Sequence, residues 1–199
     1  NPDSITEISE DISEELYKES HGLIKIWDVS PELPKALDFI KWAHAKDIIV
    51  SMAHSNASIQ QVKEATDAGM KLVTHFYDLF PIPTETDEGV YPAGVTDYIN
   101  IEDRLTVELI PDGVHVHPLL IEKSLRCKGL DKIVFITDSV RGAGKKPGKY
   151  HGIYEGVQVE VTKDRGVRRV SDDILSGSTL THLQGFRNGI EKFGLSIPD

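Results

Sequence analysis

The segment DIIVSMAHS (residues 47–55) decides the fold class, because it is a nearly continuous apolar strand that ends in a polar residue, His54. A strand that is apolar on both faces is typical of a parallel sheet covered by helices. Helix signals flank it on both sides. Ser30-Pro31 before it is a helix-start pattern, and Ser58 with Gln61 after it predicts a capping box.

The same alternation extends outward along the chain. Further strands are expected in residues 22–29, 70–78, 104–113 and 131–139, with helices between several of them. Strand alternates with helix at least four times, which predicts an α/β fold, either an open doubly wound sheet or a barrel. Residues 148–175 instead alternate with a period of two and predict a small β-hairpin insertion, followed by a C-terminal helix at about 179–194.

The charge and composition of the chain restrict the kinds of molecule that it can bind. The net charge of -10 argues against nucleic acid and anionic membranes, which bind basic surfaces. No apolar run approaches the roughly 20 residues of a membrane helix. Cys127 is the one cysteine, so no internal disulfide can form, and we expect a packing role for it and a cytoplasmic protein. The N-terminus lacks the pattern of a signal peptide and does not begin with Met, so we expect a longer natural chain.

Polar side chains follow the predicted strands at the point where each ends: His54, His75, His115 and Asp138. In a parallel barrel these carboxyl ends form the rim on which sites are built. Imidazoles bind zinc, which activates water near neutral pH. A carboxylate can carry the proton to a leaving amine, and another histidine can polarise a carbonyl. Any single histidine can instead cap a helix or bond within the core. We accept that structural interpretation for the other candidates, His21, His44, His151 and His182.

Five motifs then come in order along the chain: AHSNAS, THFYDLFP, IPDGVHV, FITDSV and LSGSTLT. Together they resemble the motifs of N-acetylglucosamine-6-phosphate deacetylases of the amidohydrolase superfamily, from about Ile24 to Gly194. The resemblance implies part of a (β/α)8 TIM-type barrel of metal-dependent hydrolases, with barrel elements at about 22–145. It also implies a homodimer that acts on a small amino-sugar substrate.

The resemblance also implies a role for each site residue. His54 and His75 would bind a divalent metal, zinc before iron or another ion. Asp138 would be the general base and acid, and His115 would hold the scissile carbonyl oxygen. The residues expected to contact the sugar are His115, Asp78, Leu79, Leu175, Ser176, Gly177 and Ser178. His117 is not expected to be a ligand, because Pro118 begins a helix.

The chain departs from the family pattern in two places. The family's metal-binding Glu, its first three barrel strands and its small β domain are absent from these 199 residues, which leaves a single catalytic-barrel fragment. In addition, the segment 78–88 carries Asp78, Glu85, Asp87 and Glu88 and no basic residue, where relatives contact phosphate. About Thr86 stands where relatives have an arginine. The nearest basic candidates are Arg141, Lys145 and Lys146.

Three functions follow in order of preference. The first is a metal-dependent hydrolase that removes acetate from N-acetylglucosamine 6-phosphate, giving glucosamine 6-phosphate in amino-sugar catabolism. The second keeps this chemistry on an unphosphorylated or different N-acyl amino sugar. The third is a non-catalytic sugar-binding or interaction module. Asp138 weighs against the third, because a binding module does not need a general base.

Overall fold

The computed structural model of the protein describes residues 7–83, 87–152 and 156–197. The chain divides into two compact units, Asn1–Val107 and Glu108–Asp199, which are described one at a time. Within the described ranges, no helix combines the length and the apolar character that crossing a membrane requires.

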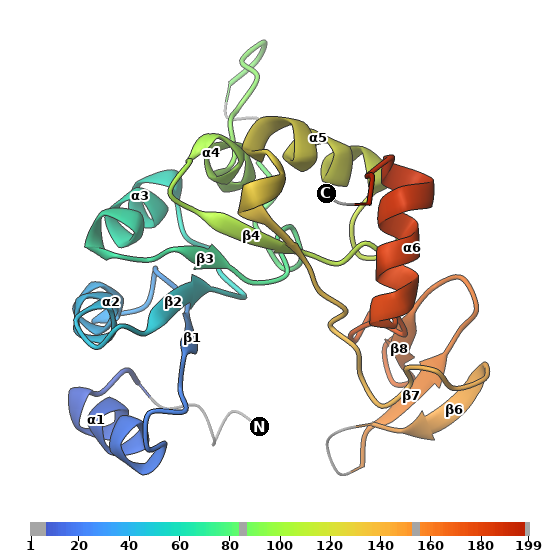
Figure 1. Cartoon of the computed structure of the whole chain (residues 1–199), viewed down its shortest axis with the longest axis horizontal. Helices are drawn as coiled ribbons and strands as arrows, with labels where there is room; N and C mark the ends of the chain where they lie inside the picture. Colours follow the sequence, from blue (N-terminus) through green and yellow to red (C-terminus); the bar gives the residue numbers. More distant parts are fainter. Residues whose placement is uncertain (1–6, 84–86, 153–155, 198–199) are drawn as a thin grey trace. The chain divides into compact units, whose positions relative to one another are not determined.

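Unit 1 alternates helices with parallel strands (Figure 1). Strand β1 pairs in parallel with β2, β2 with β3, and β3 with the first half of β4. The predicted α/β class with a parallel sheet is therefore confirmed. The elements are α1 (Glu10–Glu19), β1 (Ile26–Val29), α2 (Ala36–His44), β2 (Ile49–Met52), α3 (Ile59–Ala68), β3 (Leu72–Val73), α4 (Val95–Ile101) and β4 (Thr106–Leu109).

Strand β2 lies in the core of this unit. Its consecutive residues Val50, Ser51 and Met52 are all buried, as expected for a strand that is covered on both faces. Val73 of β3 and Val107 of β4 are buried as well. Burying each such aliphatic side chain contributes about 1.5–3 kcal/mol, so the sheet centre contributes substantially to the stability of this unit.

The two helix-start predictions have different outcomes. The capping box of α3 is confirmed: Ser58 Oγ accepts from the Gln61 backbone N–H at 3.3 Å, and Gln61 Oε1 accepts from the Ser58 N–H at 2.9 Å. The start signal at Ser30-Pro31 is wrong, because α2 begins at Ala36 after Lys35. The Ser30 hydroxyl donates to the Ala53 carbonyl at 3.0 Å, so it connects the ends of β1 and β2 and does not cap a helix.

Unit 2 combines the end of β4 with a separate antiparallel sheet. Strand β4 neighbours β5, while β6, β7 and β8 form their own three-stranded sheet around Val159, Val161 and Val167. Its elements are α5 (Pro118–Lys128), a short 3₁₀ turn (Leu130–Lys132), β5 (Ile133–Phe135), β6 (Gly148–His151), β7 (Gln158–Val161), β8 (Val167–Arg169) and α6 (His182–Phe193).

Cys127 and His117 both belong to α5 or its cap. The prediction that Cys127 is a packing residue is wrong: α5 buries Ile121 and Ser124, and Cys127 is exposed. His117 is the N-cap of α5, and its Nδ1 accepts from the Leu119 backbone N–H at 3.2 Å. This contact gives His117 a structural role.

Candidate functional site

Two of the predicted site residues, His54 and His75, lie side by side in unit 1. They follow β2 and β3, and their ring centroids are 4.7 Å apart with an interplanar angle of 67°. Both have positive backbone φ, 48° for His54 and 34° for His75. Non-glycine residues rarely adopt this conformation, and it is concentrated at functional sites, where the surrounding structure compensates for the strain.

The turn that carries His75 is held by helix α4. Tyr77 and Leu79 also have positive φ, 79° and 55°, so the turn twists at alternate residues. Asn100 of α4 is buried, and its side-chain amide donates to the Tyr77 hydroxyl at 2.8 Å and to the Thr96 carbonyl at 2.9 Å. This link stabilises a backbone that its own sequence disfavours. Of the two predicted sugar contacts here, Asp78 is half-buried and Leu79 is exposed.

Glu32 fixes the turn that carries His54. Its carboxylate accepts from the Ser55 hydroxyl at 2.6 Å and from the Asn56 backbone N–H at 2.7 Å. Glu32 is not among the site residues expected from the sequence. One feature of the sequence could have indicated its role. Glu32 is an acidic residue that directly follows Ser30-Pro31 at the end of a predicted strand, and from there it can reach the end of the neighbouring parallel strand.

The chemistry of the pair fits a metal. Nδ1 of His75 is buried and makes no hydrogen bond to any residue that the structure describes. A buried polar atom in this condition is costly, and a metal ion bound there would satisfy it. Among the described residues, no cluster of three or more His, Cys, Asp or Glu side chains could hold a metal. A catalytic zinc takes three protein ligands, so this pair alone does not make a complete catalytic zinc site.

His115 in unit 2 has a different environment. Its Nδ1 lies 2.7 Å from Asp112 Oδ2, and the two side chains are only 1% and 10% exposed. Asp112 Oδ1 accepts from the backbone N–H groups of Val114 and His115, at 2.8 and 3.0 Å. Burial raises the pKa of Asp112, but the hydrogen bonds from His115 and Val114 outweigh it and the net pKa is lowered. Asp112 is therefore a carboxylate near neutral pH.

Asp138 and the segment 175–178 meet in the same unit. Asp138, with φ of 45°, is exposed, and its backbone carbonyl accepts from the Ser178 N–H at 2.9 Å. The Ser178 hydroxyl donates to the Thr137 carbonyl. Gly177 has φ of 76°, and a Cβ there would lie 2.4 Å from a Val140 methyl group. The structure thus places Gly177 and Ser178 against the general-base candidate, while Leu175 and Ser176 are half-buried beside them.

Comparison with known proteins was made by sequence and by fold. No protein-family model matches the chain. It is 36% identical over 180 residues to N-acetylglucosamine-6-phosphate deacetylase of Vibrio furnissii, covering 90% of this chain and 42% of that protein. It is 33% identical over 178 residues to the protein of the same name from Bacillus subtilis, covering 87% and 43%. An N-acetylgalactosamine-6-phosphate deacetylase of Escherichia coli O157:H7 is 32% identical over 183 residues, covering 92% and 46%.

Solved structures agree with these relatives. A variant of N-acetyl-D-glucosamine-6-phosphate deacetylase from Mycobacterium smegmatis, in complex with N-acetyl-D-glucosamine-6-phosphate, matches with a TM-score of 0.85 at 24% identity, over 100% of this chain and 50% of that one. The Thermotoga maritima deacetylase matches with a TM-score of 0.82 at 27% identity, over 99% and 50%. The chain thus spans half or less of these relatives' length. The expected fold class, part of a TIM-type barrel, is confirmed, and the chain belongs to the N-acetylglucosamine-6-phosphate deacetylase family.

Proposed function

We propose that the whole protein is a metal-dependent amide hydrolase that removes acetate from N-acetylglucosamine 6-phosphate. The observation that carries the proposal is the pair formed by His54 and His75, two rings 4.7 Å apart at the ends of adjacent parallel strands. The buried Nδ1 of His75, which has no partner among the described residues, supports metal binding by this pair. We further propose a cytoplasmic homodimer.

Different residues of the chain are proposed to bind the metal, to transfer protons and to bind the acyl oxygen. His54 and His75 hold a divalent metal, with zinc preferred because imidazole suits it. When bound, this ion supplies Lewis acidity and lowers the pKa of water. Asp138 accepts the proton of the attacking water and returns it to the leaving amine. His115 hydrogen-bonds the acyl carbonyl oxygen as negative charge develops there.

Sugar binding is proposed for Asp78, Leu79 and the segment 175–178. The Gly177 backbone lies against Val140, and the Ser178 hydroxyl donates to the Thr137 carbonyl, so part of this segment is held rigidly. Such a preformed segment can contact a sugar with little loss of conformational freedom.

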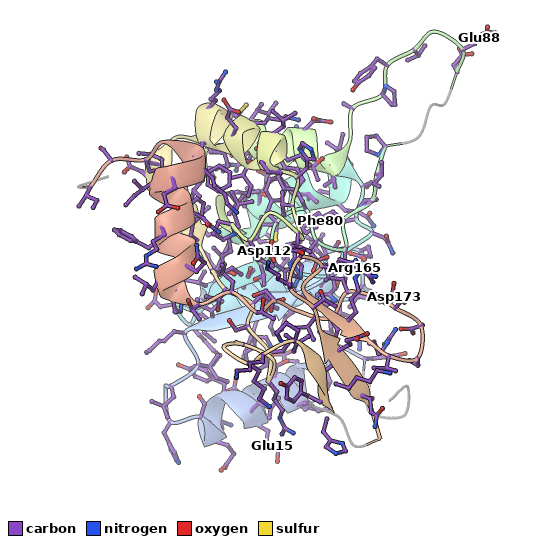
Figure 2. All side chains as sticks on the ribbon, turned by 90° about the vertical axis from the view of Figure 1, so that its right-hand side faces the viewer. Glu15, Phe80, Glu88, Asp112, Arg165 and Asp173 are labelled. Atoms are coloured by element: carbon purple, nitrogen blue, oxygen red, sulfur yellow. The ribbon has the colours of Figure 1, made fainter. Side chains whose placement is uncertain are left out.

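The 6-phosphate is the part of the substrate that the sequence supports least. Asp87 and Glu88 are exposed, and Glu88 lies at the outer end of an extended loop (Figure 2). Thr86 and Glu85 are outside the described residues. Arg141 donates to the Gly152 carbonyl at 3.2 Å, and Lys145 lies 4.5 Å from the Tyr150 ring centroid. These contacts leave the deacetylation of an unphosphorylated N-acyl amino sugar as a second candidate. A non-catalytic sugar-binding module is the third.

The test is a comparison of kcat/KM for three sugars with the protein at its full natural length. These are N-acetylglucosamine with and without the 6-phosphate, and N-acetylgalactosamine 6-phosphate, the sugar in the name of the Escherichia coli relative. Preference for N-acetylglucosamine 6-phosphate, with metal measured in the same sample, supports the proposal. Preference for the unphosphorylated sugar supports the second candidate. Sugar binding without hydrolysis in a metal-loaded sample supports the third.

A further inference from the structure

The two oxygens of the Asp112 carboxylate have different partners, one in the backbone and one in a side chain. Oδ1 accepts two backbone N–H groups, from Val114 and His115, and Oδ2 lies 2.7 Å from the His115 ring. The loop itself is anchored: the buried Asn188 of α6 donates to the Pro111 carbonyl at 2.7 Å. The carboxylate therefore has little freedom to rotate or to exchange its two oxygens.

We propose that Asp112 is the positioning residue for His115: it fixes the ring so that Nδ1 carries a proton and Nε2 is the nitrogen that meets the acyl group. This inference deepens the proposed function and rests on it. The chemical reason is that an ionised carboxylate only accepts hydrogen bonds, so the ring nitrogen beside it must donate. Which ring nitrogen carries the proton of a neutral histidine is set by such a partner.

The arrangement has a consequence for how His115 acts on a carbonyl oxygen. Because Nδ1 already donates to Asp112, Nε2 can donate only when the ring is doubly protonated. The Asp112 carboxylate stabilises that cation. Lys192 of α6 also lies near this loop, with its Nζ 3.7 Å from the position that a Cβ on Gly113 would take, and its positive charge opposes protonation. A charged donor bonds a developing oxyanion more strongly than a neutral one.

The substitution Asp112→Asn makes a directional test. The amide oxygen of Asn must take the place of Oδ1, because two backbone N–H groups point there at 2.8 and 3.0 Å. The NH₂ group then faces Nδ1 of His115. Two donors cannot share a hydrogen bond, so the neutral ring should move its proton to Nε2. The substitution thus reverses the tautomer while it keeps the shape of the side chain.

The experiment measures the ¹⁵N chemical shifts of the His115 ring in the full-length protein, at a pH at which the ring is neutral. We expect a proton on Nδ1 in the natural protein and on Nε2 in Asp112→Asn. The control is Asp172→Asn, since Asp172 Oδ1 accepts from the Ile174 backbone N–H two residues on, at 3.3 Å, while its other oxygen pairs with Arg169 at 2.7 Å. This control should leave the His115 tautomer unchanged.

Kinetics give a second, separate readout. If His115 acts as a charged donor in the transition state, Asp112→Asn should lower kcat about tenfold, with KM little changed. A proton on Nε2 in the natural protein, or on Nδ1 in Asp112→Asn, would overturn the inference. The measurement on the natural protein decides even if the variant does not fold. Absence of hydrolysis by the natural protein would instead refute the proposed function, and the ring shifts would still decide the role of Asp112.

Discussion

His75 and His115 are both buried histidines that follow a parallel strand, yet their surroundings differ. The ring of His115 lies 2.7 Å from the carboxylate of Asp112, three residues away in the same turn. The buried Nδ1 of His75 lacks a hydrogen-bond partner among the described residues, and the ring of His54 lies 4.7 Å away, centroid to centroid.

The difference separates two kinds of histidine site. A histidine that acts through hydrogen bonds needs a partner in the protein that fixes its tautomer. A metal-ligating histidine needs a neutral ring nitrogen directed at the ion, so its ring must be correctly oriented. His75 and His54 are aimed by left-handed backbone, whereas His115 is held by a side chain. The substitutions below test whether this division is real.

The largest effect is expected from removing a metal ligand. His75→Ala should reduce bound metal to a trace and abolish hydrolysis, because a catalytic zinc is held by three protein ligands and binds poorly when one is lost. His115→Gln should keep metal at the natural stoichiometry and lower kcat only. Metal content measured by mass spectrometry on the purified full-length protein separates the two. Equal metal loss in both variants would contradict the division.

Asp138→Asn should come next in size. The substitution preserves shape and removes a proton acceptor, and general acid–base catalysis is worth about 10²–10⁴-fold. We therefore expect kcat to fall by about that range while the metal content of the His54–His75 pair stays constant. Near-natural turnover with metal retained would show that another group carries the proton.

Gly177→Ala should destabilise unit 2 for two reasons, the positive backbone φ and a steric contact, and a control substitution can separate them. Positive φ alone costs an L-residue about 1–2 kcal/mol. At Gly177 the new methyl group would also meet Val140 at 2.4 Å, which adds about 1–3 kcal/mol of overpacking. Gly144 has φ of 72° with no atom within 4 Å of an added Cβ, so Gly144→Ala is the matched control. Denaturant unfolding of both should show the larger loss for Gly177→Ala, and equal losses would refute the contact.

The sequence predicts the local parts of this structure and misses the long-range ones. The capping box of Ser58 and Gln61 depends on residues three apart, and strand β2, buried at residues 50–52, follows from its apolar run. The helix expected after Ser30 starts late because the Ser30 hydroxyl bonds Ala53, a partner 23 residues away. No local pattern shows where the next parallel strand will end.

The same reasoning explains what was missed at the candidate site. The histidines and Asp138 are visible in the sequence because they end apolar strands. Asp112 is close to His115 in the sequence, but its contact depends on a turn in which Gly113 has φ of 79°. Glu32 reaches Ser55 and Asn56 only after β1 and β2 have paired in register. Residues that hold a site are harder to predict than residues that act in it, since their partners are set by the fold.

The smallest effect expected is a pH-dependent loss of stability at the ion pair of Glu102 and Arg104 in unit 1. The hydrogen bonds from Arg104, at 2.8 Å, lower the pKa of Glu102 to about 2 against the opposing effect of burial. Because the folded pKa lies below the unfolded value of 4.5, the ion pair stabilises the fold fully above pH 4.5 and this contribution is lost as the pH falls toward 2. Arg104 is half exposed, so screening by water reduces the contribution to about 1 kcal/mol.

Glu102→Gln should therefore lower stability by about 1 kcal/mol at pH 7 and by roughly a quarter of that at pH 2.5, in urea titrations at each pH. Asp112→Asn is the comparison from unit 2, since the pKa of Asp112 is also lowered by hydrogen bonds and its contribution is lost in acid too. The two variants should differ in the histidine readout: only Asp112→Asn should change the His115 ring shifts. A change of those shifts in Glu102→Gln would mean that the ion pair of Glu102 and Arg104 and the His115 site are not independent.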